Sequence, residues 1–255
     1  MTYIRIKERQ ETSLLATVIT LHENDDFFQP TQGNPLTLRE GSSSSARIVN
    51  TKNSKKTTPT LKQKIAIFGG SFDPIHCGHV EIAKQARNIA KLDKVIFLPC
   101  RRSPHKNQSP IANPTQRVEM AKLATGSISW AEVSTWEISR VPPSYSWMAA
   151  EHFHDTFPQA ELFWILGNDQ WEKLHTWYKP SRLAELMTFI VFPRKGKPLA
   201  KKGFRNLFIN VSHPASSTEA RTRIEKQEPT DKLLTRKVSA YIKEKKIYSS
   251  KELAH

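Results

Sequence analysis

Short β-branched and aromatic runs alternate with longer segments of helical periodicity from Leu61 onward. The strand-like runs cover residues 65–68, 95–99, 133–138, 162–166, 188–192 and 207–211. Helical patterns cover residues 79–91, 117–124, 146–157 and 231–245. Strands that alternate with helices predict an α/β fold, a Rossmann-like, mostly parallel sheet with helices on both faces. Its ligand site is expected at the carboxyl ends of the strands.

The first 60 residues lack this alternation. Residues 41–45 form a Gly/Ser run, and residues 51–60 are rich in Lys, Thr, Asn and Ser. This aperiodic composition predicts a low-complexity, mostly disordered N-terminal extension over residues 1–60. Residues 61–255 are therefore expected to form the folded domain.

The 255 residues carry a formal net charge of +15, which favours anionic partners. The excess of Lys and Arg is spread from Lys52 to Lys251 and is not grouped with aromatic residues, so a nucleic-acid partner is not expected. A site for phosphorylated small molecules and a merely solvated basic surface both fit the charge.

Apolar runs and cysteines bear on where the chain resides. No apolar run approaches the ~18 residues needed to cross a bilayer, so no membrane partner is expected. The two cysteines, Cys77 and Cys100, lie outside any CxxC pair, which excludes a disulfide framework. This cysteine usage predicts a reducing compartment and a cytoplasmic location.

The most informative stretch is IAIFGGSFDPIHCGHV, residues 65–80, in which a strand runs into two glycines, a proline-containing loop and a helix start. Its candidate phosphate-binding residues are Gly69, Gly70, Ser71, His76 and His79. The glycines allow close approach of backbone amides, and the helix N-terminus favours an anion. The two histidines can face one phosphoryl group and stabilise its charge without a covalent bond. A metal site through Cys77 is the alternative, but no fourth ligand lies nearby.

The pattern G-G-S-F-D-P-x-H-x-G-H resembles the signature of the HxGH nucleotidyltransferases, specifically the bacterial nicotinate-nucleotide adenylyltransferases. The resemblance runs from about Lys64 to Tyr248. A second motif, ASSTEAR at residues 215–221, would by itself be a helix cap. It is similar to the family's ISSTxIR motif, which grips the ATP phosphates. The resemblance thus implies ATP-binding roles for Ser217, Thr218 and Arg221.

Pieces between the two motifs also match the family in order and spacing. Lys106 lies in a segment similar to the PHK loop, and Arg117 and Met120 resemble the RxxM helix, where packing is the expected role. Glu137 followed by Pro143–Ser146 resembles E…PSYT, and LHTWY at residues 174–178 resembles the LxxW segment. The implied acceptor-binding residues are Lys106, Ser144, Tyr145, Ser146, Trp177 and Tyr178. Stacking of the indole on the pyridine ring is the expected role of Trp177, and a core tryptophan is the alternative.

The LGND segment at residues 166–169 resembles the family's IGAD, which implies ATP contacts for Gly167 and Asp169. Two departures stand out. Asn168 replaces an alanine, and Pro193 precedes Arg194 where the family has V-x-R-P-G, so adenine-contact roles transfer poorly to that loop.

The resemblance implies adenylyl transfer from ATP to nicotinate mononucleotide, with deamido-NAD and pyrophosphate as products. The reaction would be a direct displacement, with Mg²⁺ carried on ATP and no metal site of the protein's own. The expected catalytic residues are His76, His79, Ser71 and Arg221. One alternative is a related HxGH nucleotidyltransferase that uses nicotinamide mononucleotide or another phosphorylated acceptor. An alternative of another class is a non-catalytic nucleotide- or RNA-binding regulator.

Overall fold

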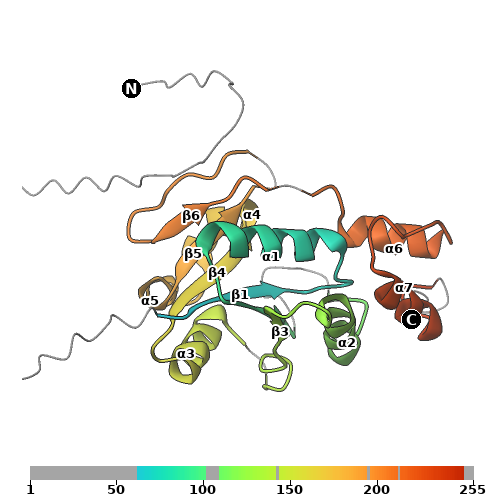
Figure 1. The fold of residues 1–255 in the computed structure, drawn as a ribbon, viewed down its shortest axis with the longest axis horizontal. Coiled ribbons are helices and arrows are strands. Elements are labelled where there is room, and N and C mark those ends of the chain that lie inside the picture. The colour runs from blue at the N-terminus through green and yellow to red at the C-terminus, as the bar shows by residue number, and fades with distance from the viewer. Residues whose placement is uncertain (1–61, 102–108, 142–143, 194–195, 212, 250–255) are drawn as a thin grey trace, which may run out of the picture. The chain divides into compact units, whose positions relative to one another are not determined.

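Six parallel strands form one sheet in the order β3-β2-β1-β4-β5-β6 in the computed structural model (Figure 1). The structure describes residues 62–101, 109–141, 144–193, 196–211 and 213–249, all within one compact unit, Thr57–His255. The strands are β1 (Lys64–Gly70), β2 (Lys94–Pro99), β3 (Ala131–Val133), β4 (Glu161–Gly167), β5 (Thr188–Phe192) and β6 (Asn206–Phe208). The extension predicted over residues 1–60 lies outside the described residues and stays a prediction.

Helices cover both faces of the sheet. They are α1 (Cys77–Ala90), α2 (Pro114–Thr125), α3 (Ser146–Thr156), α4 (Asn168–Glu172), the 3-10 helix η1 (Leu174–Thr176), α5 (Pro180–Leu186), α6 (Ser217–Glu225) and α7 (Arg236–Glu244). Figure 1 shows α1 and α3 on opposite sides of the strands. The α/β fold with helices on both faces is therefore confirmed. Within the described ranges, no helix is long and apolar enough to span a membrane.

Alternating side chains of the central strand feed two separate cores. Ala66 and Phe68 of β1 belong to a cluster shared with α1, α2 and α7, while Ile65 and Ile67 belong to a cluster shared with α3 and α5. A strand buried on both faces reads as a continuous apolar run, which is what the sequence around residue 65 contains. Two cores on one sheet fix β1 in the middle of the domain.

The point where the strand order reverses lies between β1 and β4. Strands β1, β2 and β3 progress toward one edge of the sheet, and β4, β5 and β6 progress toward the other. Loops after β1 and β4 therefore diverge to opposite faces and leave a crevice at the carboxyl ends, the usual ligand site of such sheets.

Several predicted elements differ from the observed ones. The strand predicted over residues 133–138 was wrong beyond Val133, because residues 136–139 form turns and Ser139 N donates to Thr135 O at 3.1 Å. The strand predicted at 207–211 is shorter and begins at Asn206. The helix predicted over 231–245 begins only at Arg236, because the Thr235 side chain caps it by accepting from Val238 N.

Candidate active site

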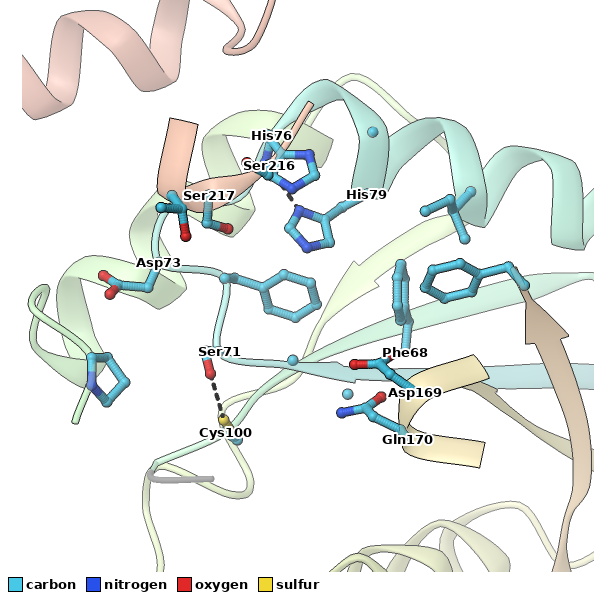
Figure 2. Close-up of a pocket in the computed structure, with 18 of the residues that line it drawn as sticks. Phe68, Ser71, Asp73, His76, His79, Cys100, Asp169, Gln170, Ser216 and Ser217 are labelled. Atoms are coloured by element: carbon cyan, nitrogen blue, oxygen red, sulfur yellow. Dashed lines mark hydrogen bonds between the residues drawn. The ribbon is translucent and has the colours of Figure 1, made fainter. Parts of the chain in front are cut away.

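A cavity of about 930 Å³ opens at the carboxyl ends of the strands. Its walls come from the end of β1, the segment after β2, the start of α4, the end of β5 and the first turns of α1 and α6. Figure 2 shows the loop after β1 turning up to the start of α1, with Ser216 and Ser217 beside it. The cavity lies at the expected reversal point of the sheet.

His76 and His79 form one end of this cavity at the start of α1. His76 is the N-cap residue and His79 lies in the first turn, and each is 8% exposed. The backbone N–H of His76 donates to His79 Nδ1 at 3.2 Å, so the ring proton of neutral His79 lies on Nε2. The Phe72 ring packs edge-on against His79 with centroids 5.0 Å apart. The first turn of α1 contains no acidic residue, which leaves the helix N-terminus suited to an anion.

Two glycines in this region lie close to aromatic rings. A Cβ at Gly70 would lie 3.0 Å from the Phe72 ring, and one at Gly78 would lie 3.0 Å from Nδ1 of both His76 and His213. Contacts this short force a shift of the ring. Gly78 thus lets the rings of His76 and His213 pack directly against the start of α1.

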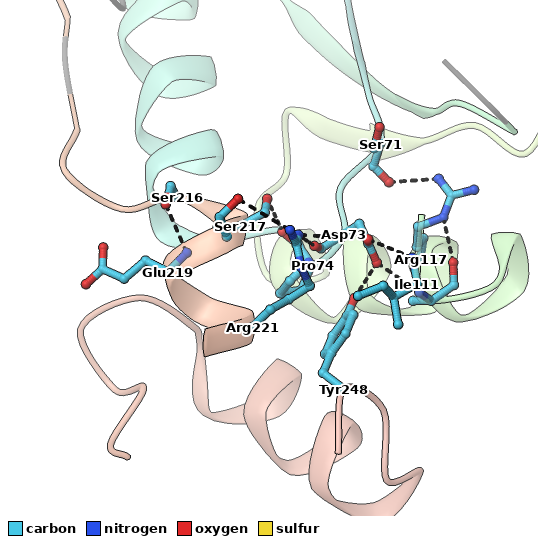
Figure 3. A network of polar contacts seen from close by, with 12 residues as sticks. Ser71, Asp73, Pro74, Ile111, Arg117, Ser216, Ser217, Glu219, Arg221 and Tyr248 are labelled. Atoms are coloured by element: carbon cyan, nitrogen blue, oxygen red, sulfur yellow. Dashed lines mark hydrogen bonds and ion pairs between the residues drawn. The ribbon is translucent and has the colours of Figure 1, made fainter. Parts of the chain in front are cut away.

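The first turn of α6 supplies an adjacent wall, beside the loop that leads into α1. Ser216 caps the helix, accepting from Glu219 N at 3.1 Å, so the capping role expected for this motif is confirmed. Ser217 Oγ donates to Pro74 O at 2.9 Å and Arg221 Nη1 donates to Asp73 O at 2.7 Å (Figure 3). Ser217, Thr218 and Arg221 line the cavity. The two motifs that the sequence analysis singled out therefore meet in space.

Arg117 holds the loops behind the cavity in place. Its side chain is fully buried in α2 and donates to four backbone carbonyls, at 2.6 to 3.1 Å. Those carbonyls belong to Ser71, Cys100, Arg101 and Ala112. Met120 on the same helix is also fully buried. The packing role expected for the RxxM helix is confirmed.

The predicted acceptor-binding residues divide into three groups. Ser144, Ser146 and Trp177 line the cavity. The rings of Tyr145 and Tyr178 contact each other at a tilt of 36°, with centroids 4.9 Å apart, and neither is part of the lining. Lys106 lies outside the described residues. Trp177 packs against the second core cluster and also lines the cavity. It therefore has the burial expected of a core tryptophan and the position expected of a residue that contacts the acceptor.

Glu137 also lines the cavity, and the pKa of its carboxyl group is raised. Burial raises its pKa from 4.5 to about 7, and a hydrogen bond from the Arg101 backbone and the charge of Arg117 offset this only in part. Near neutral pH this group therefore exists in both the protonated and the ionised form.

The segment after β4 places Asp169 and Gln170 in the lining. Gly167 is the N-cap of α4 and precedes them, outside the lining. Asn168 is buried, and its Nδ2 donates to Glu172 Oε1 at 3.0 Å. The polar side chain that replaces alanine therefore has a hydrogen-bond partner within α4. Pro193 lines the cavity, whereas Arg194 lies outside the described residues.

Sequence reasoning missed several lining residues, among them Phe72, Asp73, Gln170 and His213. Asp73 had a usable signal, because an acidic residue inside a phosphate-binding loop requires partners that neutralise it. His213 gave none, since its place beside Gly78 depends on how α6 packs on α1. Within the described part of the chain, no group of three or more His, Cys, Asp or Glu is arranged to hold a metal ion.

The fold and cavity have counterparts among known proteins. Residues 67–223 match the cytidylyltransferase-like family, so the chain has the fold of a nucleotidyltransferase.

Comparison with curated proteins narrows the family assignment. A probable nicotinate-nucleotide adenylyltransferase of Methylacidiphilum infernorum is 41% identical over 203 residues, which are 79% of this chain and 98% of the relative. The nicotinate-nucleotide adenylyltransferase of Bacillus subtilis is 36% identical over 189 residues, which are 74% of this chain and 100% of the relative. The chain belongs to the nicotinate-nucleotide adenylyltransferase family, as its motifs indicated.

A solved structure supports the fold. Plasmodium falciparum nicotinic acid mononucleotide adenylyltransferase complexed with NaAD aligns with a TM-score of 0.62 at 21% identity, covering 73% of this chain and 97% of that one. At this identity the likeness concerns the arrangement of the strands and helices.

Proposed function

We propose that this protein transfers the adenylyl group of ATP to nicotinate mononucleotide, forming deamido-NAD and pyrophosphate. Membership of the adenylyltransferase family supports the reaction. The observation that carries the proposal is the meeting of two helix starts in one cavity, those of α1 with His76 and His79 and of α6 with Ser217 and Arg221. Two such groups suit a reaction between two phosphorylated molecules.

The proposed chemistry is one in-line displacement. A phosphate oxygen of the mononucleotide attacks the α-phosphorus of ATP while the bond to the bridging oxygen breaks, and the electron pair leaves with pyrophosphate. The attacking phosphate is already ionised at neutral pH, so no base has to remove a proton. Catalysis then consists of alignment and charge stabilisation.

The lining residues have distinct proposed roles. His76 and His79, with the amides at the start of α1 and the hydroxyl of Ser71, would stabilise charge that develops on the transferred phosphoryl group. Ser217, Thr218 and Arg221 would hold the β- and γ-phosphates. Gly69 and Gly70 would let backbone amides approach the ATP phosphates, whereas Gly167 and Asp169 would contact the ribose and adenine side of ATP. Mg²⁺, which we propose enters with ATP, would neutralise further charge on its phosphates.

The acceptor would occupy the end of the cavity lined by Ser144, Ser146 and Trp177. The Trp177 indole offers a flat apolar face for a pyridine ring. Tyr145, Tyr178 and Lys106 remain candidate acceptor residues by family resemblance. Cys77 and Cys100 are not joined in a disulfide, which accords with the cytoplasmic location that we propose for the reaction.

Isotope-labelled ATP tests the transfer. With nicotinate mononucleotide present, phosphorus from the α-position should appear in deamido-NAD, and phosphorus from the β- and γ-positions should appear in pyrophosphate. Label from the α-position in free AMP alone would indicate hydrolysis. No product of either kind, with ATP still bound, would support the non-catalytic regulator.

A further inference from the structure

The last turn of the described chain lies against the phosphate-binding loop. Tyr248, just beyond α7, is 1% exposed and belongs to the first core cluster. A buried phenol needs a partner for its hydroxyl. Tyr248 Oη donates to Asp73 Oδ1 at 2.7 Å, across 175 residues of sequence (Figure 3). Burial and the charge of Asp73 raise the pKa of Tyr248 well above 10, so the hydroxyl keeps its proton and acts as donor.

Asp73 connects this tyrosine to two other segments. Its Oδ2 accepts from Ile111 N at 2.9 Å, and its Oδ1 accepts from Ala112 N at 3.0 Å as well as from Tyr248. Arg221 Nη1 lies 3.9 Å from Asp73 Oδ2. The orientation of one carboxylate is thus set by the segment after β2, by the C-terminal turn and by α6.

Arg221, which lines the cavity together with Asp73 and Ile111, is the cation of this group. Its Nη1 donates to Asp73 O at 2.7 Å and its Nη2 donates to Thr218 Oγ1 at 3.3 Å. The distance of 3.9 Å to the Asp73 carboxylate is longer than a direct charged hydrogen bond. Because its other donors satisfy the carboxylate, Asp73 orients the guanidinium without binding it tightly.

We propose that Tyr248 is a positioning residue for ATP binding. Its hydroxyl orients the Asp73 carboxylate, and that carboxylate orients Arg221. The proposal rests on the proposed function in so far as Arg221 binds the ATP phosphates. Without the Tyr248 hydroxyl, Asp73 Oδ1 loses one of two donors inside the protein. A buried carboxylate that has lost a hydrogen-bond donor is stabilised by a closer contact with the nearest cation. A closer Asp73–Arg221 pair would withdraw positive charge from the phosphate side of the cavity and leave the acceptor side unchanged.

The test compares Tyr248→Phe with Tyr241→Phe, a half-buried tyrosine of α7 that packs against the same core cluster. ATP affinity is measured by calorimetry without an acceptor, and KM is measured for each substrate, at a temperature where circular dichroism shows both variants folded. We expect Tyr248→Phe to weaken ATP about tenfold and to leave the KM of nicotinate mononucleotide within about twofold. Tyr241→Phe should change neither. Equal weakening of both substrates, or unchanged ATP affinity, would overturn the proposal.

A double-mutant cycle with Arg221→Ala separates positioning from a general loss of packing. If Tyr248 acts through Arg221, adding Tyr248→Phe to Arg221→Ala should change ATP affinity by less than about twofold. A full multiplication of the two losses would overturn the proposal. If Tyr248→Phe does not fold, Asp73→Asn takes its place: without a carboxylate to draw Arg221 away from the phosphates, ATP affinity should stay within about twofold or rise, and a tenfold loss would contradict the proposal. Failure of the proposed function would give a different result: the wild-type protein would bind ATP but would not convert nicotinate mononucleotide.

Discussion

The imidazole rings of His76 and His79 lie against each other, with centroids 3.7 Å apart and planes inclined by 32°. Two rings this close, at the start of a 14-residue helix, concentrate N–H donors at a single point of the cavity. An anion beside the two rings would stabilise any positive charge that the pair carries. The pair therefore suits a reaction in which negative charge develops on a phosphoryl group.

His79→Ala should lower kcat by about 100-fold or more while ATP still binds, because a charge-stabilising donor acts mainly in the transition state. Steady-state kinetics and calorimetric ATP binding measure the two effects separately. His154→Ala, at an exposed position of α3 outside the cavity, is the matched control and should leave both unchanged. Near-normal turnover of His79→Ala would remove this residue from the proposed chemistry.

Arg117→Met should destabilise the fold by about 3 kcal/mol or more, because it removes a buried cation and leaves several carbonyls without a donor. Urea denaturation of both proteins measures the difference. Lys122→Met changes an exposed residue of the same helix and should stay within about 0.5 kcal/mol. A comparably small effect at Arg117 would contradict the proposed scaffold role.

Glu137 should make stability depend on pH. Its folded-state pKa of about 7 exceeds the unfolded value of 4.5, so the folded protein binds more protons between these values. Its contribution is therefore fully present below pH 4.5 and is lost as pH rises to about 7. Because the side chain is only partly buried, we expect a loss on the order of 2 kcal/mol.

Urea denaturation at several pH values checks this expectation. Glu137→Gln should flatten the decline between pH 4.5 and about 7, whereas Glu225→Gln, at an exposed position of α6, should leave it unchanged. An identical pH profile for Glu137→Gln and the unchanged protein would show that the carboxyl pKa is not raised.

A chain that starts at Thr60 should fold and keep its activity. The central strand of the sheet begins only at Lys64, and the aperiodic composition of residues 1–60 predicts no packing on the domain. The melting temperature and kcat/KM should match those of the full-length chain. Loss of folded protein or of activity would show that the first 60 residues serve the domain or the site.

Much of the fold was predictable because its central strands are buried on both faces. The apolar runs at 162–166 and 188–192 marked β4 and β5 within two residues. The segment from 168 to 186 was missed, since α4, η1 and α5 are each seven residues or shorter and give no helical period. The apolar spacing at 133–138 resembled a strand, but turns form there beyond the short edge strand β3.

The site was predictable where a motif is local and less so where contacts are remote. His76 and His79 are close in sequence, so their meeting could be read directly. The link between Asp73 and Tyr248 joins residues 175 apart, and the position of Tyr248 depends on how the chain after α7 returns to the core. Tyr145 and Tyr178 were chosen by resemblance; their rings contact each other outside the cavity lining, and their role in acceptor binding stays a prediction.

The most direct test of the proposed function is the ratio of kcat/KM for two acceptors, nicotinate and nicotinamide mononucleotide, with ATP saturating. A carboxylate is satisfied by donors alone, whereas a carboxamide also needs an acceptor. A pocket that offers mainly donors, as the family resemblance implies for this chain, therefore discriminates against the amide. We predict a preference for nicotinate mononucleotide of at least about 100-fold, equivalent to about 2.7 kcal/mol. Equal values, or a preference for nicotinamide mononucleotide, would contradict the assigned acceptor.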